Sequence, residues 1–326
     1  MKKLLAVAVA AALVAPLAAS ANPVVYGRAN IGVVNTDSDN ADSSWDTEQN
    51  ASRLGVKGSE DLGNGLTAVY QFEFGVDASD EGTLSGRLAY AGIAGGFGTV
   101  AVGRQTTPYY STVDKTDLFA TSMAGANDHY LGPVRIGNAL AYVSPNFSGL
   151  TAIAALVIDS DGNEATVDHN GDGVSGADLI NVALTYDNGP LSLGGSWLTF
   201  NGAYNHKLAS SALGTITIGE DSDLWGLSGK YNFGSFAAVG QYESLKGDSG
   251  TPDVTAWGLG GEVYLGNNTI KAVYGNVDID DLDYSEGNWA IGLDHAFSKR
   301  THVWVDYNDS NIDENKRFGV GIRHDF

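Results

Sequence analysis

The chain ends with the decapeptide Arg317-Phe318-Gly319-Val320-Gly321-Ile322-Arg323-His324-Asp325-Phe326, in which two sets of side chains alternate strictly. One set holds Phe318, Val320, Ile322, His324 and Phe326, and the other holds two glycines with Arg317, Arg323 and Asp325. This is the two-residue period of a β-strand. A full-length strand that stops on an aromatic ring is typical of a membrane barrel, whose last strand pairs with the first and turns its apolar face to lipid. The decapeptide therefore predicts an all-β transmembrane barrel, with Phe326 as its assembly signal.

The amino-terminal residues have the pattern of an export signal. Lys2 and Lys3 precede an apolar run from Leu4 to Leu17, and the small residues Ala19-Ser20-Ala21 follow it. That run has 14 residues, which is too few to span a bilayer as a helix. We therefore predict a secretory signal peptide over residues 1–21 and a barrel domain over residues 22–326.

The composition suits many short strands joined by tight turns. The chain has 43 glycines, 7 prolines and no cysteine, so a disulfide framework is excluded. Its 39 acidic residues outnumber its 18 lysines and arginines, which gives a formal net charge of −21. A nucleic-acid partner is disfavoured, because phosphate binding requires a basic face.

Sixteen segments have about the length that a tilted membrane strand requires. In chain order they lie near 24–34, 52–60, 66–76, 86–95, 98–105, 136–144, 150–158, 178–187, 191–200, 224–232, 235–244, 254–265, 269–277, 288–297, 301–308 and 317–326. Short connections such as Asp61-Leu62-Gly63-Asn64-Gly65 alternate with longer acidic ones, as expected for periplasmic turns and external loops. The sequence therefore predicts one antiparallel barrel of sixteen strands without a second domain.

Polar and apolar residues keep to opposite faces within these segments. The third segment has Leu66, Ala68, Tyr70, Phe72 and Phe74 on one face, and Thr67, Gln71 and Glu73 on the other. Apolar residues facing lipid and polar residues facing a water-filled lumen give this pattern. A β-sandwich would show the same alternation around a core, but sandwich strands average about half this length.

Several motifs place this chain beside a known family. They are Val25-Tyr26-Gly27-Arg28, the stretch from Ser52 to Gly65, Gly86-Arg87-Leu88-Ala89-Tyr90-Ala91-Gly92, Phe97-Gly98-Thr99-Val100 with Gly103-Arg104-Gln105, and the terminal Gly321-Ile322-Arg323-His324-Asp325-Phe326. On these residues the chain resembles the trimeric general-diffusion porins of Gram-negative outer membranes, over essentially its whole length. The resemblance implies a homotrimer in outer-membrane lipid and lipopolysaccharide, and a third external loop that folds into the lumen.

The connection from Thr106 to Arg135 has 30 residues and is much the longest in the first half of the chain. A structureless connection of this length is usually functional. The resemblance implies that it is the inward-folded loop, and that its carboxylates face a row of basic side chains on the barrel wall. The residues that match this basic row are Arg28, Arg53, Arg87 and Arg135, each on the lumen-facing phase of its strand or at the start of the strand.

The acidic side of the constriction matches the family less well. Asp117, in Thr116-Asp117-Leu118, resembles the loop carboxylate of the family, but Thr121 stands where a second acid is expected. Asp114 and Asp128 are the candidates to replace it. The departure puts the strength of the transverse field in doubt and leaves the architecture unaffected.

A separate segment, Asp168-His169-Asn170-Gly171-Asp172-Gly173, reads like the start of a calcium loop, with oxygen ligands at alternate positions and glycine at the turn. The twelfth position is Leu179, and the nearest carboxylate is Asp178. The candidate metal ligands are therefore Asp168, Asn170, Asp172 and Asp178. A disordered acidic loop is the alternative.

The sequence predicts a passive channel for small hydrophilic solutes and ions, without energy coupling or cofactor. The six histidines are scattered and no serine lies in a nucleophile elbow, so we predict no enzymatic activity. The alternatives are a solute-specific channel, for example for an oligosaccharide, and a barrel that serves as an adhesin or structural anchor. The inward loop and the arginine row favour the channel, because an anchor needs neither.

Ion selectivity depends on two competing sets of charges. The arginine row repels cations, whereas external acids enrich them at the mouth across a screening length of about 8 Å. These acids are Asp37, Asp39, Asp42, Asp80, Glu81, Glu220, Asp221, Asp278, Asp280, Asp281, Asp283, Asp313 and Glu314. Their number predicts a modest preference for cations.

Overall fold

The structure is a computed structural model, and it describes residues 23–38, 41–79, 82–120, 130–158, 177–201, 204–207, 215–248, 250–280, 284–311 and 315–326. The predicted signal peptide over residues 1–21 lies outside these ranges. Within them, no helix is both long enough and apolar enough to cross a membrane.

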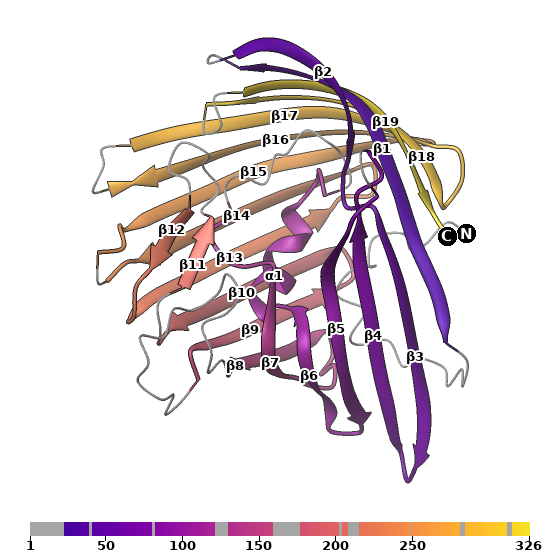
Figure 1. The fold of residues 1–326 in the computed structure, drawn as a ribbon, viewed down its shortest axis with the longest axis vertical. Coiled ribbons are helices and arrows are strands. Elements are labelled where there is room, and N and C mark those ends of the chain that lie inside the picture. Colours follow the sequence, from indigo (N-terminus) through magenta and orange to yellow (C-terminus); the bar gives the residue numbers. More distant parts are fainter. Residues whose placement is uncertain are drawn as a thin grey trace.

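The wall of the molecule is one antiparallel sheet that closes on itself (Figure 1). Its strands are β1 (Val24–Ser38), β2 (Ala41–Gln49), β3 (Arg53–Gly63), β4 (Leu66–Val76), β5 (Leu84–Gly95), β6 (Gly98–Thr106), β7 (Arg135–Val143), β8 (Leu150–Val157), β9 (Leu179–Asn188), β10 (Leu191–Phe200), β13 (Ser222–Asn232), β14 (Phe236–Lys246), β15 (Val254–Leu265), β16 (Asn268–Ile279), β17 (Tyr284–Ala296), β18 (Thr301–Ser310) and β19 (Asn315–Asp325). From β3 to β10 and from β13 to β19 each strand pairs with the next along the chain, β10 pairs with β13, and both β2 and β3 pair with β1. The sheet closes where β1 pairs with β19, from Arg28 opposite Asp325 to Ser38 opposite Asn315.

The barrel has sixteen wall positions, which confirms the predicted number, although its sheet holds seventeen strands. β2 and β3 share one position: β2 pairs with the later residues of β1, and β3 with the earlier ones. Ala51, with a φ of 52°, lies in the break between them. Asn30 fills this break, because its N–H donates to Ser52 Oγ at 2.9 Å and its carbonyl accepts from the same hydroxyl at 3.0 Å.

Two short elements differ from the sequence expectation. β2 is polar along its length and shows no apolar alternation, so Asp37 and Asp42 were expected in a loop but lie in the β1 and β2 strands. A separate hairpin, β11 (Tyr204–Lys207) with β12 (Thr215–Ile218), stands between β10 and β13. β2, β11 and β12 all lie outside the sixteen predicted segments.

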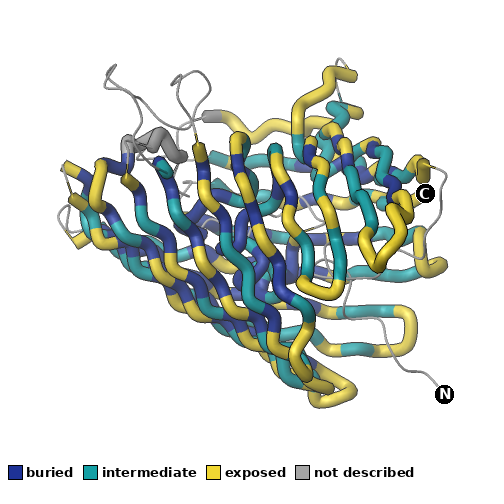
Figure 2. The backbone as a smooth tube through the Cα atoms, turned by 90° about the horizontal axis from the view of Figure 1, so that it is seen from below, coloured by how far each residue is buried: buried dark blue, intermediate teal, exposed yellow. Residues whose placement is uncertain are grey.

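The outer face is apolar, and exposure alternates along the strands (Figure 2). In β19, for example, Phe318, Val320 and Ile322 are exposed, while Gly319 between them is buried. Aromatic pairs lie across neighbouring strands of this face, with ring centroids 5.3–5.5 Å apart: Trp225 with Tyr242, Trp257 with Tyr274, and Trp289 with Tyr307. An apolar band with aromatic residues at its edge is typical of a barrel in lipid.

The inner face is not uniformly polar, as the alternation alone would suggest. Between β6 and β7 the chain forms α1 (Pro108–Val113) and a 3-10 turn, η2 (Asp114–Thr116), which pack on β9, β10, β13 and β14 inside the ring of strands (Figure 1). The inner face opposite them carries buried apolar side chains, among them Leu198, Phe200, Leu224, Leu245, Val254 and Ile279, in one cluster with Tyr109, Val113, Tyr130 and Leu131 of the loop. One side of the barrel interior is therefore a hydrophobic core, and the polar face is left to the other side.

Closure of the barrel depends on the chain terminus. Gly27 N–H donates to the Phe326 carbonyl at 3.0 Å, and Phe326 N–H donates back to Gly27 O at 3.0 Å. The Phe326 ring lies against Gly27 so closely that a Cβ atom there would overlap it. The last residue thus completes the β1–β19 ladder and covers the glycine with an apolar ring.

Deleting Phe326 should therefore impair barrel assembly much more than Thr67→Ala, which trims an inward side chain of β4 and leaves every strand pair intact. Two hydrogen bonds and the ring contact are lost at a site where lipid offers no substitute partner. The yield of heat-modifiable barrel after refolding, measured by gel shift, should fall severalfold for the deletion only. Equal yields from the two variants would show that the terminal residue is dispensable.

Candidate pore constriction

Five arginines gather on the inner face of five wall strands near one another. They are Arg323 of β19, Arg28 of β1, Arg53 of β3, Arg87 of β5 and Arg135 of β7. Four of them are the predicted basic row, and Arg323 is an addition. The structure thus brings the predicted arginines together, while their effect on permeation stays a prediction.

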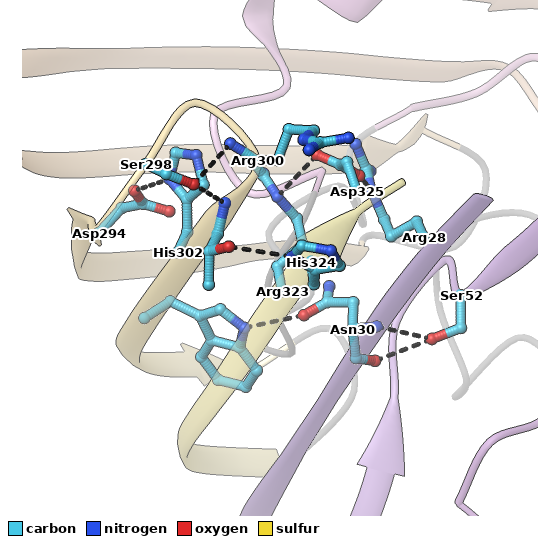
Figure 3. Close-up of polar contacts among 12 residues, drawn as sticks. Arg28, Asn30, Ser52, Asp294, Ser298, Arg300, His302, Arg323, His324 and Asp325 are labelled. Atoms are coloured by element: carbon cyan, nitrogen blue, oxygen red, sulfur yellow. Dashed lines mark hydrogen bonds and ion pairs between the residues drawn. The ribbon is translucent and has the colours of Figure 1, made fainter. Parts of the chain in front are cut away.

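Asp325 holds the first two of these arginines (Figure 3). Arg28 Nε donates to Asp325 Oδ1 at 2.6 Å, and Arg323 Nε lies 3.4 Å from Asp325 Oδ2. The register explains the contact, because Arg28 stands directly opposite Asp325 and Arg323 is two residues away on the same face. The strand pair that closes the barrel therefore also places two members of the row.

Glu73 of β4 holds the next two arginines. Its Oε1 accepts from Arg87 Nε at 2.7 Å, and its Oε2 lies 3.8 Å from Arg53 Nε. Tyr26 OH donates to the same Oε2 at 3.0 Å. The Glu73 carboxylate is nearly buried between them, so it fixes both guanidinium groups against the wall.

Arg135 continues the row at the first residue of β7. It interacts electrostatically with Arg87 and Arg53, and Arg53 interacts in turn with Arg28. Across the described residues, Glu73 and Asp325 are the carboxylates that form ion pairs with these five arginines. Five guanidinium groups against two carboxylates leave this wall with an excess of positive charge.

The loop presents Tyr110 to this wall. Thr107 caps α1, since its Oγ1 accepts from Tyr110 N–H at 3.0 Å, and Pro108 begins the helix without needing a hydrogen bond of its own. The Tyr110 phenol interacts electrostatically with Arg87 and Arg135, and also with the loop acids. Burial raises the pKa of Tyr110, so the phenol is neutral at physiological pH.

Two of the three predicted loop acids lie in the described part of the chain. Burial raises the pKa of Asp114 to about 7, with Asp117 adding to the increase and Lys115 opposing it. Asp117 follows directly after η2, and its N–H donates to the Asp114 carbonyl at 3.2 Å. Asp128 lies outside the described residues. The acidic side is thus present but partly neutral near pH 7.

Uncharged polar side chains lie next to the arginines on the same wall, two residues along the strands from Arg28 and Glu73. Gln71 Nε2 donates to Tyr26 OH, and Tyr90 OH donates to Gln71 Oε1 at 2.9 Å. Lys57 Nζ lies 5.2 Å from the centre of the Tyr26 ring. Gln71 and Tyr90 are buried, so this network connects β1, β4 and β5 behind the charged groups.

Trp304 is an inward-facing aromatic residue, but it is too buried to contact a solute. Its ring faces inward but is only 1% exposed, because it lies flat over Gly32 and Gly321, where a Cβ atom would overlap it. Its Nε1 donates to Asn30 Oδ1 at 2.9 Å (Figure 3). The residue is therefore part of the wall packing.

The predicted calcium ligands Asp168, Asn170 and Asp172 lie outside the described residues. Asp178 is described: it is buried just before β9, and its N–H donates to the Val157 carbonyl at 2.9 Å. Among the described residues, no group of three acidic, histidine or cysteine side chains is placed to hold a metal ion. Calcium binding stays a prediction.

Sequence reasoning did not assign Arg323, Asp325 and Glu73 to the constriction. The two-residue period places all three on the lumen-facing side of their strands. It does not show at which level of the barrel axis they lie. Their roles depend on register, for example on Glu73 lying opposite Gly55 and Leu88 in the neighbouring strands. An alignment of neighbouring strands, residue by residue, would have been needed to identify them.

Comparison with known proteins agrees with this geometry. The family model described as Gram-negative porin matches residues 5–315. Outer membrane porin protein 32 of Delftia acidovorans is 31% identical over 93% of this chain and 87% of its own length, and the monosaccharide porin of Halomonas sp is 26% identical over the full length of both. Among solved structures, the anion-selective porin from Comamonas acidovorans superposes with a TM-score of 0.75 at 23% identity, covering 94% of this chain and 99% of its own. The chain therefore belongs to the Gram-negative porin family and is an outer-membrane barrel.

Proposed function

We propose that this porin passes small hydrophilic solutes and ions by passive diffusion, and that its narrowest region favours anions. Membership of the porin family supports the diffusion channel and is consistent with the expectation that the chain is not an enzyme. The observation that carries the anion preference is the wall of five arginines, with which two described carboxylates pair. An excess of fixed positive charge at a constriction raises the local concentration of anions.

The loop side does not cancel this excess. Asp114 has a pKa of about 7 and is partly protonated at neutral pH, and its neighbour Lys115 carries the opposite charge. Lys115 Nζ donates to the Leu193 carbonyl of β10 at 3.0 Å, which ties this side chain to the wall under the loop. The proposed preference for anions agrees with the name of the anion-selective porin from Comamonas acidovorans, which is similar to this chain in fold.

The sequence-based expectation of modest cation selectivity finds no support here. That expectation was based on the number of external acids and not on their distance from the constriction. Two of them, Asp37 and Asp42, lie in strands. Exposed acids at the mouth act over a screening length of about 8 Å, so their influence fades toward the constriction. The arginines line the constriction itself, and ions pass them at close range.

A sugar-selective channel is the second candidate. The observation that favours it is the relative that is named a monosaccharide porin, which is 26% identical over the full length of both chains. Swelling of proteoliposomes in isosmotic glucose and in gluconate distinguishes the two functions. Faster uptake of glucose than of the similarly sized anion would favour the sugar channel.

We also propose that the functional unit is a homotrimer in lipid and lipopolysaccharide, as the family resemblance implies. The broad exposed apolar face of the single barrel is compatible with contact to lipid and to neighbouring copies. Chemical cross-linking in native outer membranes, read as a ladder that stops at three copies, is the direct measurement.

The first permeation test is Arg53→Gln. Removing one unit charge from the constriction should lower the anion-to-cation permeability ratio by about two- to fivefold, because a charge a few ångströms away in water contributes on the order of 1 kcal/mol or less. Reversal potentials of single channels under a KCl gradient give the ratio. The matched control is Arg317→Gln, since Arg317 pairs with Glu48 near the outer end of β19, away from the row.

A wild-type reversal potential that shows cation preference at every salt concentration would refute the proposed order of the two charge sets. Screening provides a further check. Raising the salt should weaken the external acids first, so the anion preference should increase before it levels off.

The second permeation test concerns pH. The Asp114 carboxyl has a pKa of about 7, so it is charged above pH 7 and neutral below it. Acidification from pH 8 to pH 6 should therefore raise the anion-to-cation permeability ratio by about two- to fivefold, again the effect of one unit charge. Asp114→Asn should show the high ratio at both pH values.

His302 is a second titratable group on the inner face, where its Nδ1 lies 2.7 Å from Asp294 Oδ1 (Figure 3). His302→Gln is therefore the control. A pH response that survives Asp114→Asn but disappears in His302→Gln would assign the titration to the histidine.

A further inference from the structure

One buried carboxylate on the wall binds both legs of the inward loop. Glu243 lies on β14 and is fully buried. Its Oε2 accepts from Tyr109 OH at 2.6 Å and from Leu131 N–H at 2.9 Å. Tyr109 belongs to α1 on the outgoing leg and Leu131 to the returning leg, so a single side chain joins the two legs to the wall.

Gln241, two residues earlier on the same face, extends this contact. Its Nε2 donates to Glu243 Oε1 at 3.1 Å, and its Oε1 accepts from the Thr116 hydroxyl of η2. Thr116 Oγ1 in turn lies 3.1 Å from Tyr130 OH on the returning leg. Both oxygens of the Glu243 carboxylate are therefore engaged, and the network reaches from α1 through η2 to Leu131.

The barrel wall itself does not require this carboxylate. β14 pairs with β13 and β15 through backbone groups, and the apolar cluster beside Glu243 includes Leu224 and Leu245. A buried charge among such residues is unfavourable unless donors surround it, and an apolar side chain would fill the place without that penalty. The three donors and the absence of any ion pair of Glu243 within the described chain point to a role in holding the loop.

The loop lies inside the ring of strands, so its position affects the space that is left for solutes. Tyr109 is followed by Tyr110, whose phenol interacts electrostatically with Arg87 and Arg135. A shift of α1 away from β14 would carry Tyr110 with it. We infer that Glu243 is a positioning residue of this porin: it sets the separation between the loop and the arginine row without touching the solute. The inference rests on the diffusion channel of the proposed function and is independent of which ion the channel prefers.

The test is Glu243→Gln in the full-length protein. The amide keeps the size of the side chain but turns one acceptor into a donor, so one of the three hydrogen bonds becomes an unfavourable contact between two donors. Leaving a buried donor or acceptor without a partner shifts an equilibrium by about tenfold or more. In single-channel records, the fraction of time that the channel spends at conductances above the main level should therefore be about ten times larger than in the wild type. The main level should keep the wild-type reversal potential, because the arginine row is unchanged.

Tyr109→Phe removes one donor of the same network by a different route and should produce the same levels. The double variant should show less than the sum of the two single effects, since both residues belong to one hydrogen-bond network. The matched control is Glu262→Gln on β15, another carboxylate on this chain that accepts from a tyrosine, with Tyr264 OH at 2.8 Å and Lys230 Nζ at 2.8 Å. It bears no contact to the loop in the described residues and should give no new conductance level.

The inference would be overturned if correctly folded Glu243→Gln and Tyr109→Phe barrels gave the same conductance levels as the wild type. So would the same new levels in Glu262→Gln, because they would then reflect lumen charge. If Glu243→Gln does not assemble, Tyr109→Phe alone decides, since it removes only a hydroxyl. Failure of the anion preference would appear in the reversal potential and would leave these conductance levels interpretable.

Discussion

Every backbone N–H and C=O group inside a bilayer needs a partner from the protein, and in this chain that requirement is met by pairing β1 with β19. The pairing does more than remove two sheet edges. It fixes the register of Arg28 opposite Asp325, and it seats the Phe326 ring on Gly27. The same ladder that closes the barrel therefore also defines one end of the charged row in its lumen.

The second organising feature is the hydrophobic core inside the barrel. Residues of β7 to β16 that would face water in an empty barrel instead pack on Tyr109, Val113, Tyr130 and Leu131 of the loop. The loop is thus held by apolar burial as well as by hydrogen bonds, and water is confined to the side that carries the arginines. The asymmetry of the lumen follows from which half of the inner face is apolar.

The sequence predicted the strand-based architecture well because its signals are local. The two-residue period of Arg317 to Phe326 and the alternation in β4 are visible without any knowledge of neighbours. The break at Ala51 and the polar strand β2 escaped, because pairing there depends on Asn30 and Ser52 meeting across strands. In β10, Trp197 and Leu198 are both apolar although they face opposite sides, so the period is lost where the loop packs. Glu243 looked like any polar residue facing a lumen, and its partners are more than one hundred residues away in the chain.

The division of the interior into a solid half and a wet half has a consequence for how such a protein can be altered. Under the proposed function, substitutions at the arginines or at Glu73 would alter which ions and solutes pass. Substitutions in the apolar cluster under the loop would change how firmly the loop is held against the wall. These side chains are buried, so they have little contact with solutes or ions. Permeability and anchoring of the loop are thus separate engineering targets in this barrel, because they depend on different side chains.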